Sequence, residues 1–236
     1  MLGFGEADSD VLARHFLAAE ASGRSGHGVR RIEWLESLPG LDPAARPRRV
    51  VSEPGYERWD GNGAVGYLTL HAVVQAQLAE PPPHARLVVC GRTFPTGVLG
   101  HWTRPLAAAG LVAALTATSP RRLGHPGGGP KLTGTNPLSI AIPSSNGHPV
   151  VTDVSMGNLT YGDVLAGRAN EDDLAPFGGK QAHKAFALAV GLQLLVDALI
   201  PADGFGAVLL VAQPEADPVP QFRELAAGVR LPGDRV

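Results

Sequence analysis

The sequence predicts an α/β protein in which a mixed sheet is covered by helices. Helical and strand-like segments are interspersed along the whole chain, which favours one mixed sheet over separate all-helical and all-strand layers. No G-x-G-x-x-G follows a predicted strand, so the usual dinucleotide-binding turn is not expected. Apolar residues at helical spacing predict helices at 9–21 and 184–199. Short β-branched runs predict strands near 86–90, 111–116, 138–142, 150–154 and 206–212.

The remaining segments fit the same scheme. Ser9 can cap the first helix, and Gly23 follows its end. The glycine-rich segment 124–137 is expected to be a loop. Further helices are expected at 29–38, at 65–80 before three prolines, at 98–110 and at 219–229, with a proline-punctuated loop at 39–47.

The late apolar stretch, residues 185–200, is expected to be a buried helix. Gln193 and Asp197 interrupt it, and it falls short of the ~20 residues that a membrane span requires. Cys90 is the only cysteine, so it cannot form an internal disulfide, and a core position is expected. The 236 residues have the length and the 44% hydrophobic content of a globular chain, and we expect a single unit over 1–236.

Charge and composition exclude several classes of function. Twenty basic and 22 acidic residues give a net charge of −2, so there is no overall positive field to attract nucleic acid or an anionic membrane. The first ten residues contain Glu6, Asp8 and Asp10 but no basic residue, unlike a secretory signal. A cytoplasmic protein without nucleic-acid or membrane partners is therefore expected.

His27, in the segment "RSGHGVRRI", is the first candidate for chemistry. A histidine in a glycine-flanked loop is most often a solvated turn residue. However, Gly26 and Gly28 leave the imidazole uncrowded, and Arg31 follows four residues later. A guanidinium beside an acid/base histidine suits a carboxylate substrate, because it can hold both oxygens and fix the neighbouring carbon.

The segment "PGGGPKLTGTNP" also has two interpretations. Successive glycines and a lysine can shape a phosphate cradle from backbone N–H groups. The segment lacks the Gly-Lys-Ser/Thr end of a P-loop, and a structural turn is an equally good interpretation. A nicotinamide cofactor would thus need a mode of binding other than these standard motifs.

Taken together, several segments resemble one known family. In chain order they are "SGHGVRRI", "WDGNGAVGYLTLHAV", "GLVAALTATSP", "GGGPKLTGTNPLSIAIP", "PVVTDVS", "FGGKQAHKAFALAVGLQLLVDAL" and "LPGDRV". The sequence of these landmarks is similar to that of the malate/L-lactate dehydrogenase family. The most specific landmark is G-T-N-P, Gly134 to Pro137, with the strand that follows it. The resemblance covers nearly the whole chain and implies the non-Rossmann fold of that family.

The resemblance implies roles for four residues on the substrate side. His27 looks like the proton donor or acceptor, and Asp153 like the carboxylate that orients its imidazole. Arg31 corresponds to the clamp for the substrate carboxylate, and Thr135 in G-T-N-P to a second substrate-binding residue. On the cofactor side, Lys184, Gly97 and Ser119 match positions that contact NADH or NADPH. No metal is implied.

The chain also departs from the family pattern. Gly26 stands where the family has a serine, and Pro95 where it has a second histidine that faces nicotinamide. Ala185 replaces the glycine that normally follows the lysine. The chain is shorter than the family between Asp153 and Gly178 and again near its C-terminus, and these losses fall mainly on the cofactor side.

Two hypotheses follow. The first is an NAD(P)H-dependent oxidoreductase for a small 2-oxo acid, 2-hydroxy acid or cyclic imine carboxylate, with His27 moving the proton. The alternative is a relative without redox function that uses the same pocket for cofactor-independent proton transfer, such as isomerisation, cyclisation or elimination, or only for binding. The resemblance also implies a homodimer.

Overall fold

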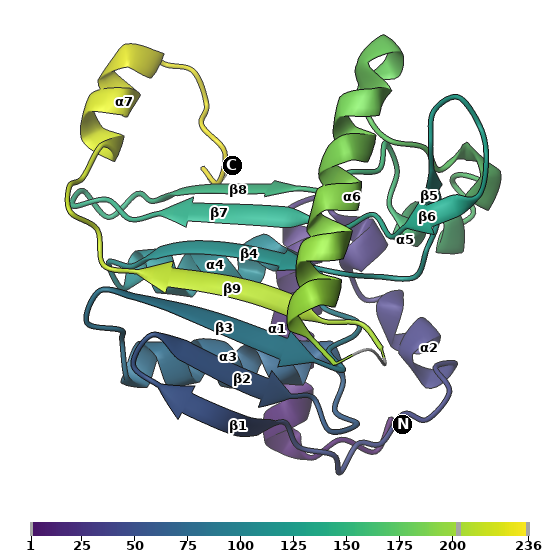
Figure 1. Ribbon diagram of the computed structural model, residues 1–236, viewed down its shortest axis with the longest axis horizontal. Coiled ribbons are helices and arrows are strands. Elements are labelled where there is room, and N and C mark those ends of the chain that lie inside the picture. The colour runs from purple at the N-terminus through teal and green to yellow at the C-terminus, as the bar shows by residue number, and fades with distance from the viewer. Residues whose placement is uncertain (1, 202–203, 235–236) are drawn as a thin grey trace.

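The protein is built on one mixed β-sheet, described here from a computed structural model that covers residues 2–201 and 204–234 (Figure 1). Its strands are β1 (Arg48–Glu53), β2 (Tyr56–Asp60), β3 (Ala85–Gly91), β4 (Val112–Ala117), β7 (Leu138–Ile142), β8 (Val150–Val154) and β9 (Ala207–Ala212). They lie in the order β1-β2-β3-β9-β4-β7-β8. β2 and β3 are parallel, and every other neighbouring pair is antiparallel. This confirms the predicted mixed sheet and its five predicted strands.

Helices cover both faces of the sheet, but unequally. Behind the sheet in Figure 1 lie α1 (Glu6–Ala21), α3 (Gly66–Ala79) and α4 (Leu99–Ala108), whereas α6 (Ala182–Leu199) crosses the front. Alternate residues of β4, such as Ala113, Leu115 and Ala117, are buried in the main core together with residues of the three rear helices.

Smaller elements lie around the edges of the sheet. The short helices are α2 (Arg31–Glu36), α5 (Tyr161–Leu165) and α7 (Val219–Ala226), and single 3₁₀ turns span Ser25–His27, Glu171–Asp173 and Gly179–Gln181. The glycine-rich segment forms a hairpin in which β5 (Leu123–Gly124) pairs with β6 (Lys131–Thr133). Gly157 and Pro176 form an isolated antiparallel bridge, which closes the base of the segment that carries α5.

The strands β1 and β2 were not predicted from the sequence. The expectation that no G-x-G-x-x-G follows a strand is therefore wrong, since Gly61–Gly66 fits this pattern directly after β2 and leads into α3. Its glycines allow close backbone packing, because a side chain on Gly61 or Gly66 would overlap the carbonyl of Arg92 or Pro95, and they do not line the cavity described below.

β1 is largely exposed, so it has no apolar alternation. In β2, Glu57 occupies a buried position that a pattern search expects to be apolar. Its carboxylate accepts hydrogen bonds from the Trp59 indole at 2.8 Å and from Gln77 at 2.9 Å, and it lies 3.4 Å from the Arg86 guanidinium. These partners permit a carboxylate inside the sheet layer.

Two details of the predicted helices are wrong. α1 begins at Glu6 with Gly5 as its N-cap, so Ser9 lies inside the first turn and its hydroxyl bonds the Phe4 carbonyl instead. The helix predicted as buried, α6, is largely exposed: Leu188 and Leu194 are 52% and 61% exposed. The buried residues of α6 include the polar Gln193, which accepts a hydrogen bond from Asn136 at 3.0 Å and donates to Asp197.

Among the described residues, one helical stretch, Gly179–Leu199, is long and apolar enough to cross a membrane by length and composition alone, which is weak evidence for a span. Gln193 and Asn136 fasten this stretch to the G-T-N-P loop beside the sheet. The predicted core position of Cys90 is confirmed, since its side chain is fully buried in β3.

His15 of α1 supports the start of α4 from inside the core. Its Nε2 accepts a hydrogen bond from the Val98 backbone N–H at 2.9 Å, and its ring stacks on Trp102. Desolvation by burial is the main cause that lowers the pKa of His15 from 6.5 to about 2. The imidazole is therefore neutral in the folded protein at any ordinary pH, and it serves as an acceptor.

His15 makes stability sensitive to acid. Below pH 6.5 His15 becomes protonated in the unfolded chain but stays neutral in the folded chain, so the unfolding free energy falls as the pH falls. The contribution of His15 to this fall is about 1.4 kcal/mol per pH unit, and His15→Gln should remove it. Urea unfolding at intervals between pH 7 and pH 4 measures this slope. His84→Gln, at an exposed position, should leave the slope of the wild type unchanged. An equal slope in wild type and His15→Gln would contradict the assignment.

Candidate active site

A cavity of about 470 Å³ lies between the His27 segment, the start of α4 and the ends of the central strands. This is within the size range of sites for small molecules and cofactors. Six of the seven residues predicted as site residues line it, although they are spread over more than 120 positions of the chain. These six are His27, Gly97, Ser119, Thr135, Asp153 and Arg31.

His27 ends a 3₁₀ turn between α1 and α2. Its Nδ1 is buried and has no hydrogen-bond partner among the described residues. Burial, followed by the positive charges of Arg31 and Arg24, lowers the pKa of His27 to about 3, and Asp163 acts in the opposite direction. The imidazole is neutral at pH 7 and can accept a proton. It can donate one only when a bound anion offsets the nearby positive charge.

Arg31 is the first residue of α2 and lines the cavity, as predicted. Its side chain is 7% exposed. The Nε atom donates to the Gly26 carbonyl at 2.8 Å, and the guanidinium lies over the Trp34 ring, 4.7 Å from the ring centroid. These contacts fix the plane of the guanidinium and leave its two terminal nitrogens for a ligand, which is the geometry needed to hold a carboxylate.

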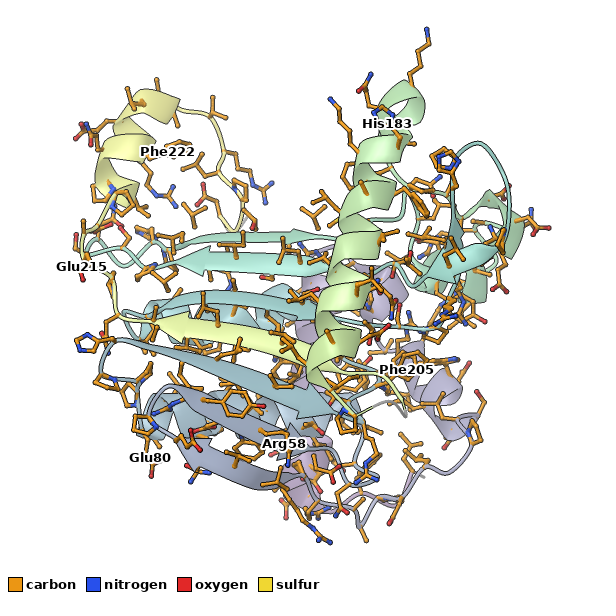
Figure 2. All side chains as sticks on the ribbon, in the orientation of Figure 1. Arg58, Glu80, His183, Phe205, Glu215 and Phe222 are labelled. Atoms are coloured by element: carbon orange, nitrogen blue, oxygen red, sulfur yellow. The ribbon has the colours of Figure 1, made fainter. Side chains whose placement is uncertain are left out.

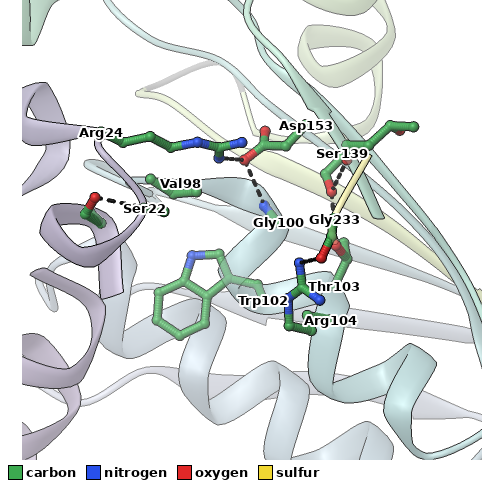
Figure 3. Close-up of polar contacts among 12 residues, drawn as sticks. Ser22, Arg24, Val98, Gly100, Trp102, Thr103, Arg104, Ser139, Asp153 and Gly233 are labelled. Atoms are coloured by element: carbon green, nitrogen blue, oxygen red, sulfur yellow. Dashed lines mark hydrogen bonds and ion pairs between the residues drawn. The ribbon is translucent and has the colours of Figure 1, made fainter. Parts of the chain in front are cut away.

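Asp153, at the end of β8, does not make the predicted contact with His27. No hydrogen bond joins the two in the part of the chain that the structure describes. The Asp153 carboxylate is instead 2.7 Å from the Arg24 guanidinium and accepts the Gly100 backbone N–H at 3.0 Å (Figure 3). Burial raises the pKa of Asp153, while the bonds from Gly100 and Arg24 favour its charged form. The predicted contact between Asp153 and His27 is wrong, because the Asp153 carboxylate pairs with the Arg24 guanidinium and not with the imidazole.

The packing of α5 explains the glycine at position 26. A Cβ atom on Gly26 would lie 2.8 Å from the Thr160 hydroxyl, and one on Gly162 would overlap the Gly26 carbonyl. The two backbones can therefore touch only because neither residue has a side chain. Thr160 and Asp163 form a capping box at the start of α5, which places the Asp163 carboxylate in the cavity beside His27.

The predicted cofactor-side residues separate into two groups. Gly97 and Ser119 line the cavity, next to Pro95. Gly97 has a φ of 68°, and a side chain there would overlap His15 and Tyr67. Lys184 is exposed on the first turn of α6 and does not line the cavity. Figure 2 shows its neighbour His183 at the outer end of that helix. The β5–β6 hairpin does not line the cavity either, which favours the structural-turn interpretation of its glycines.

Four charged residues of the cavity were missed by the sequence analysis: Arg24, Arg122, Asp163 and Arg168. Arg24 was visible in the quoted motif "RSGHGVRRI". The other three lie in segments that have no recognisable motif, and only the folded arrangement brings them to His27.

A mixed sheet covered by helices, with a cavity lined by histidine, arginine and aspartate side chains, defines an α/β protein with a charged pocket beside the sheet. The sequence profile of the malate/L-lactate dehydrogenase family matches residues 1–174. The chain belongs to this family.

Relatives agree with this assignment. The 2,3-diketo-L-gulonate reductase of Citrobacter koseri is 30% identical in an alignment of 181 positions, gaps included, that covers 72% of this chain and 52% of that protein. The Salmonella heidelberg protein of the same name is 29% identical in an alignment of 184 positions, gaps included, that covers 74% of this chain and 53% of that protein. The chain thus spans about half the length of the curated relatives it matches.

Solved structures show the same fold. The Δ1-piperideine-2-carboxylate reductase of Pseudomonas syringae has a TM-score of 0.85 at 23% identity, with 99% of this chain and 86% of that chain covered. The malate dehydrogenase of Entamoeba histolytica has a TM-score of 0.83 at 18% identity, with 100% and 83% covered.

The glycine contact between Gly26 and α5 can be tested by adding a single methyl group. Gly162→Ala should lower the unfolding free energy by about 1–3 kcal/mol, because its Cβ has no room beside Gly26. Gly191→Ala is the matched control, since Gly191 is also helical and nothing lies near its Cβ position; it should stabilise by about 0.5–1 kcal/mol. Chemical unfolding measures both. A Gly162→Ala protein as stable as wild type would refute the close contact.

Proposed function

We propose that the protein is an NAD(P)H-dependent oxidoreductase for a small 2-oxo acid, 2-hydroxy acid or cyclic imine carboxylate. The observation that carries the proposal is a single cavity lined both by the buried Arg31 and by His27, whose Nδ1 has no hydrogen-bond partner among the described residues. Membership in the malate/L-lactate dehydrogenase family and the reductase names of the relatives support the reaction class.

The residues divide the work as follows. Arg31 holds the substrate carboxylate with its two terminal nitrogens, which places the neighbouring C–O or C–N carbon near His27. The bound carboxylate offsets the positive charge of Arg31, so the pKa of His27 rises toward neutrality and the imidazole can move the proton. Asp153 acts at a distance, because its carboxylate holds Arg24 and the start of α4 at the cavity wall.

Four residues of the cavity wall would hold a nicotinamide ring: Pro95, Gly97, Ser119 and Thr135. Gly97 has no side chain that could block the ring, and Ser119 and Thr135 each carry a hydroxyl group that could bind a carboxamide. A bound nicotinamide supplies or accepts the hydride. Lys184 lies outside the cavity, so a contact between Lys184 and NADH or NADPH would involve a part of the nucleotide beyond the nicotinamide.

That position of Lys184 also supports the alternative function. With Pro95 in place of a histidine, the cofactor side is less complete than the substrate side. The same His27 and Arg31 could then perform cofactor-independent proton transfer, or the pocket could only bind an acid. Saturable binding of NADH or NADPH to the wild type separates these functions.

We also propose a cytoplasmic homodimer. Leu188, Leu194 and Leu195 of α6 are between 46% and 61% exposed. Such an apolar helix face is typical of a protein–protein interface, and a second copy of the chain is the partner that covers it.

The role of His27 predicts a specific separation of effects. His27→Ala should lower turnover by about 10²–10⁴-fold, the usual contribution of a general acid or base, and leave nucleotide binding intact. Steady-state reduction of 2-oxo acids and cyclic imine carboxylates, together with calorimetric titration of NADH and NADPH, measures both quantities. His148→Ala, at an exposed position, is the control and should behave as wild type. If wild type binds neither nucleotide at millimolar concentration, the redox assignment fails.

The dimer is tested by placing a charge on the α6 surface. Leu194→Glu should convert the dimer to a monomer, because an unpaired carboxylate in an apolar interface is strongly unfavourable. Leu225→Glu, on the 78% exposed Leu225 of α7, should leave the dimer intact. Light scattering at micromolar concentration measures the mass. A monomeric wild type would rule out the homodimer.

A further inference from the structure

The charges around the cavity do not balance. Four guanidinium groups line it, from Arg24, Arg31, Arg122 and Arg168, against the two carboxylates of Asp153 and Asp163. Each of these carboxylates forms an ion pair with an arginine of the cavity wall. Arg24 lies 2.7 Å from Asp153, and Arg168 lies 2.7 Å from Asp163 and also bonds it through Nε. Arg31 and Arg122 are therefore the two cations whose charges no lining carboxylate neutralises.

Arg122 is as well fixed in place as Arg31. Its guanidinium stacks on the Tyr161 ring, 3.5 Å from the ring centroid, and its side chain is only 18% exposed. Its Nε is buried and has no hydrogen-bond partner in the part of the chain that the structure describes, although the Glu171 carboxylate is 3.3 Å away. Glu171 is 56% exposed and does not line the cavity, so water screens its charge.

Arg31 and Arg122 line the same cavity. Burial is the main cause that lowers the pKa of Arg31, and the positive charge of Arg122 acts in the same direction, whereas Tyr67, Tyr161 and Asp163 oppose it. Two poorly hydrated like charges are unfavourable in a protein unless an anion lies between them or contacts each of them. Because each guanidinium has its own aromatic support, each is positioned to hold its own anionic group.

We infer that the substrate is a dianion, a 2-oxo or 2-hydroxy acid with a second acidic group, whose first carboxylate binds Arg31 and whose second group binds Arg122. The inference rests on the proposed function and narrows it. Arg122 is the specificity-determining residue, and it selects dianions over monoacids of the same chain length. A cofactor phosphate is the other source of an anion at Arg122, and the experiment distinguishes the two sources.

The binding experiment needs no cofactor. Malate and 2-hydroxybutanoate share a four-carbon chain and differ by the second carboxylate, and 2-hydroxyglutarate and 2-hydroxypentanoate form the corresponding five-carbon pair. Calorimetric titration of the nucleotide-free protein should show that at least one dianion binds about 10- to 100-fold more tightly than its monoacid partner, as expected for one additional charge-assisted contact.

The variants locate the effect. Arg122→Gln should abolish the preference for the dianion and leave the affinity for the monoacid unchanged, which also shows that the variant is folded. Arg122→Lys should keep part of the preference, because an ammonium preserves the charge but not the forked contact. Arg121→Gln removes the same charge from the neighbouring exposed residue, and it should preserve the full preference.

Two results would overturn the inference. Equal affinity of wild type for dianion and monoacid in both pairs would show that Arg122 binds no substrate group. Weaker binding of NADH or NADPH by Arg122→Gln, with dianion binding unaffected, would assign Arg122 to a cofactor phosphate. A failure of the proposed redox function has a different signature: the dianion preference would be present, but no nucleotide would bind and no 2-oxo acid would be reduced.

Discussion

The Asp153 carboxylate joins the three parts of the chain that form the cavity. It stands at the end of β8, it accepts the Gly100 N–H at the start of α4, and it pairs with Arg24 just after α1 (Figure 3). α4 is in turn held from the other side by His15 through the Val98 N–H. A largely buried carboxylate requires such partners, since an isolated charge would be costly there. The position of the His27 turn relative to the sheet therefore depends on this one group.

Much of the fold could be predicted because it follows from local regularities. The strands β3, β4, β7, β8 and β9 have short β-branched runs, and the rear helices have apolar faces. β1 and β2 could not be predicted, because an exposed edge strand has no alternation and the burial of Glu57 depends on partners such as Gln77 and Arg86. The exposure of α6 was also unpredictable, since apolar composition does not distinguish a helix face buried in the core from one left uncovered.

The sequence predicted those residues of the candidate site that lie in recognisable motifs, and it missed those that only folding brings to the cavity. His27, Arg31 and Thr135 lie in motifs that resemble those of a known family, so their convergence was expected. The partner of Asp153 could not be inferred from spacing. Arg24 and His27 are only three positions apart, so a sequence pattern cannot tell which of them contacts the Asp153 carboxylate. Arg122 stands beside a glycine-rich loop without a distinctive motif, and its place in the cavity depends on Tyr161, almost 40 residues later. Contacts of this kind become visible only in the folded chain.

The isolated bridge between Gly157 and Pro176 makes the segment that carries α5 a closed loop whose two ends are joined outside the main sheet. The two ends of this segment meet. The Asn158 backbone N–H donates to the Ala175 carbonyl, and the Ala175 N–H donates to the Asn158 side-chain Oδ1. The entropic cost of closing a loop depends only weakly on its length, so a longer or shorter loop between the same two ends changes the stability of the protein little. Tyr161, Asp163 and Arg168 are all carried by this closed loop, whereas His27 and Asp153 are held by the main framework. Replacing this one loop would therefore change the part of the cavity wall formed by Tyr161, Asp163 and Arg168, while the sheet stays as it is.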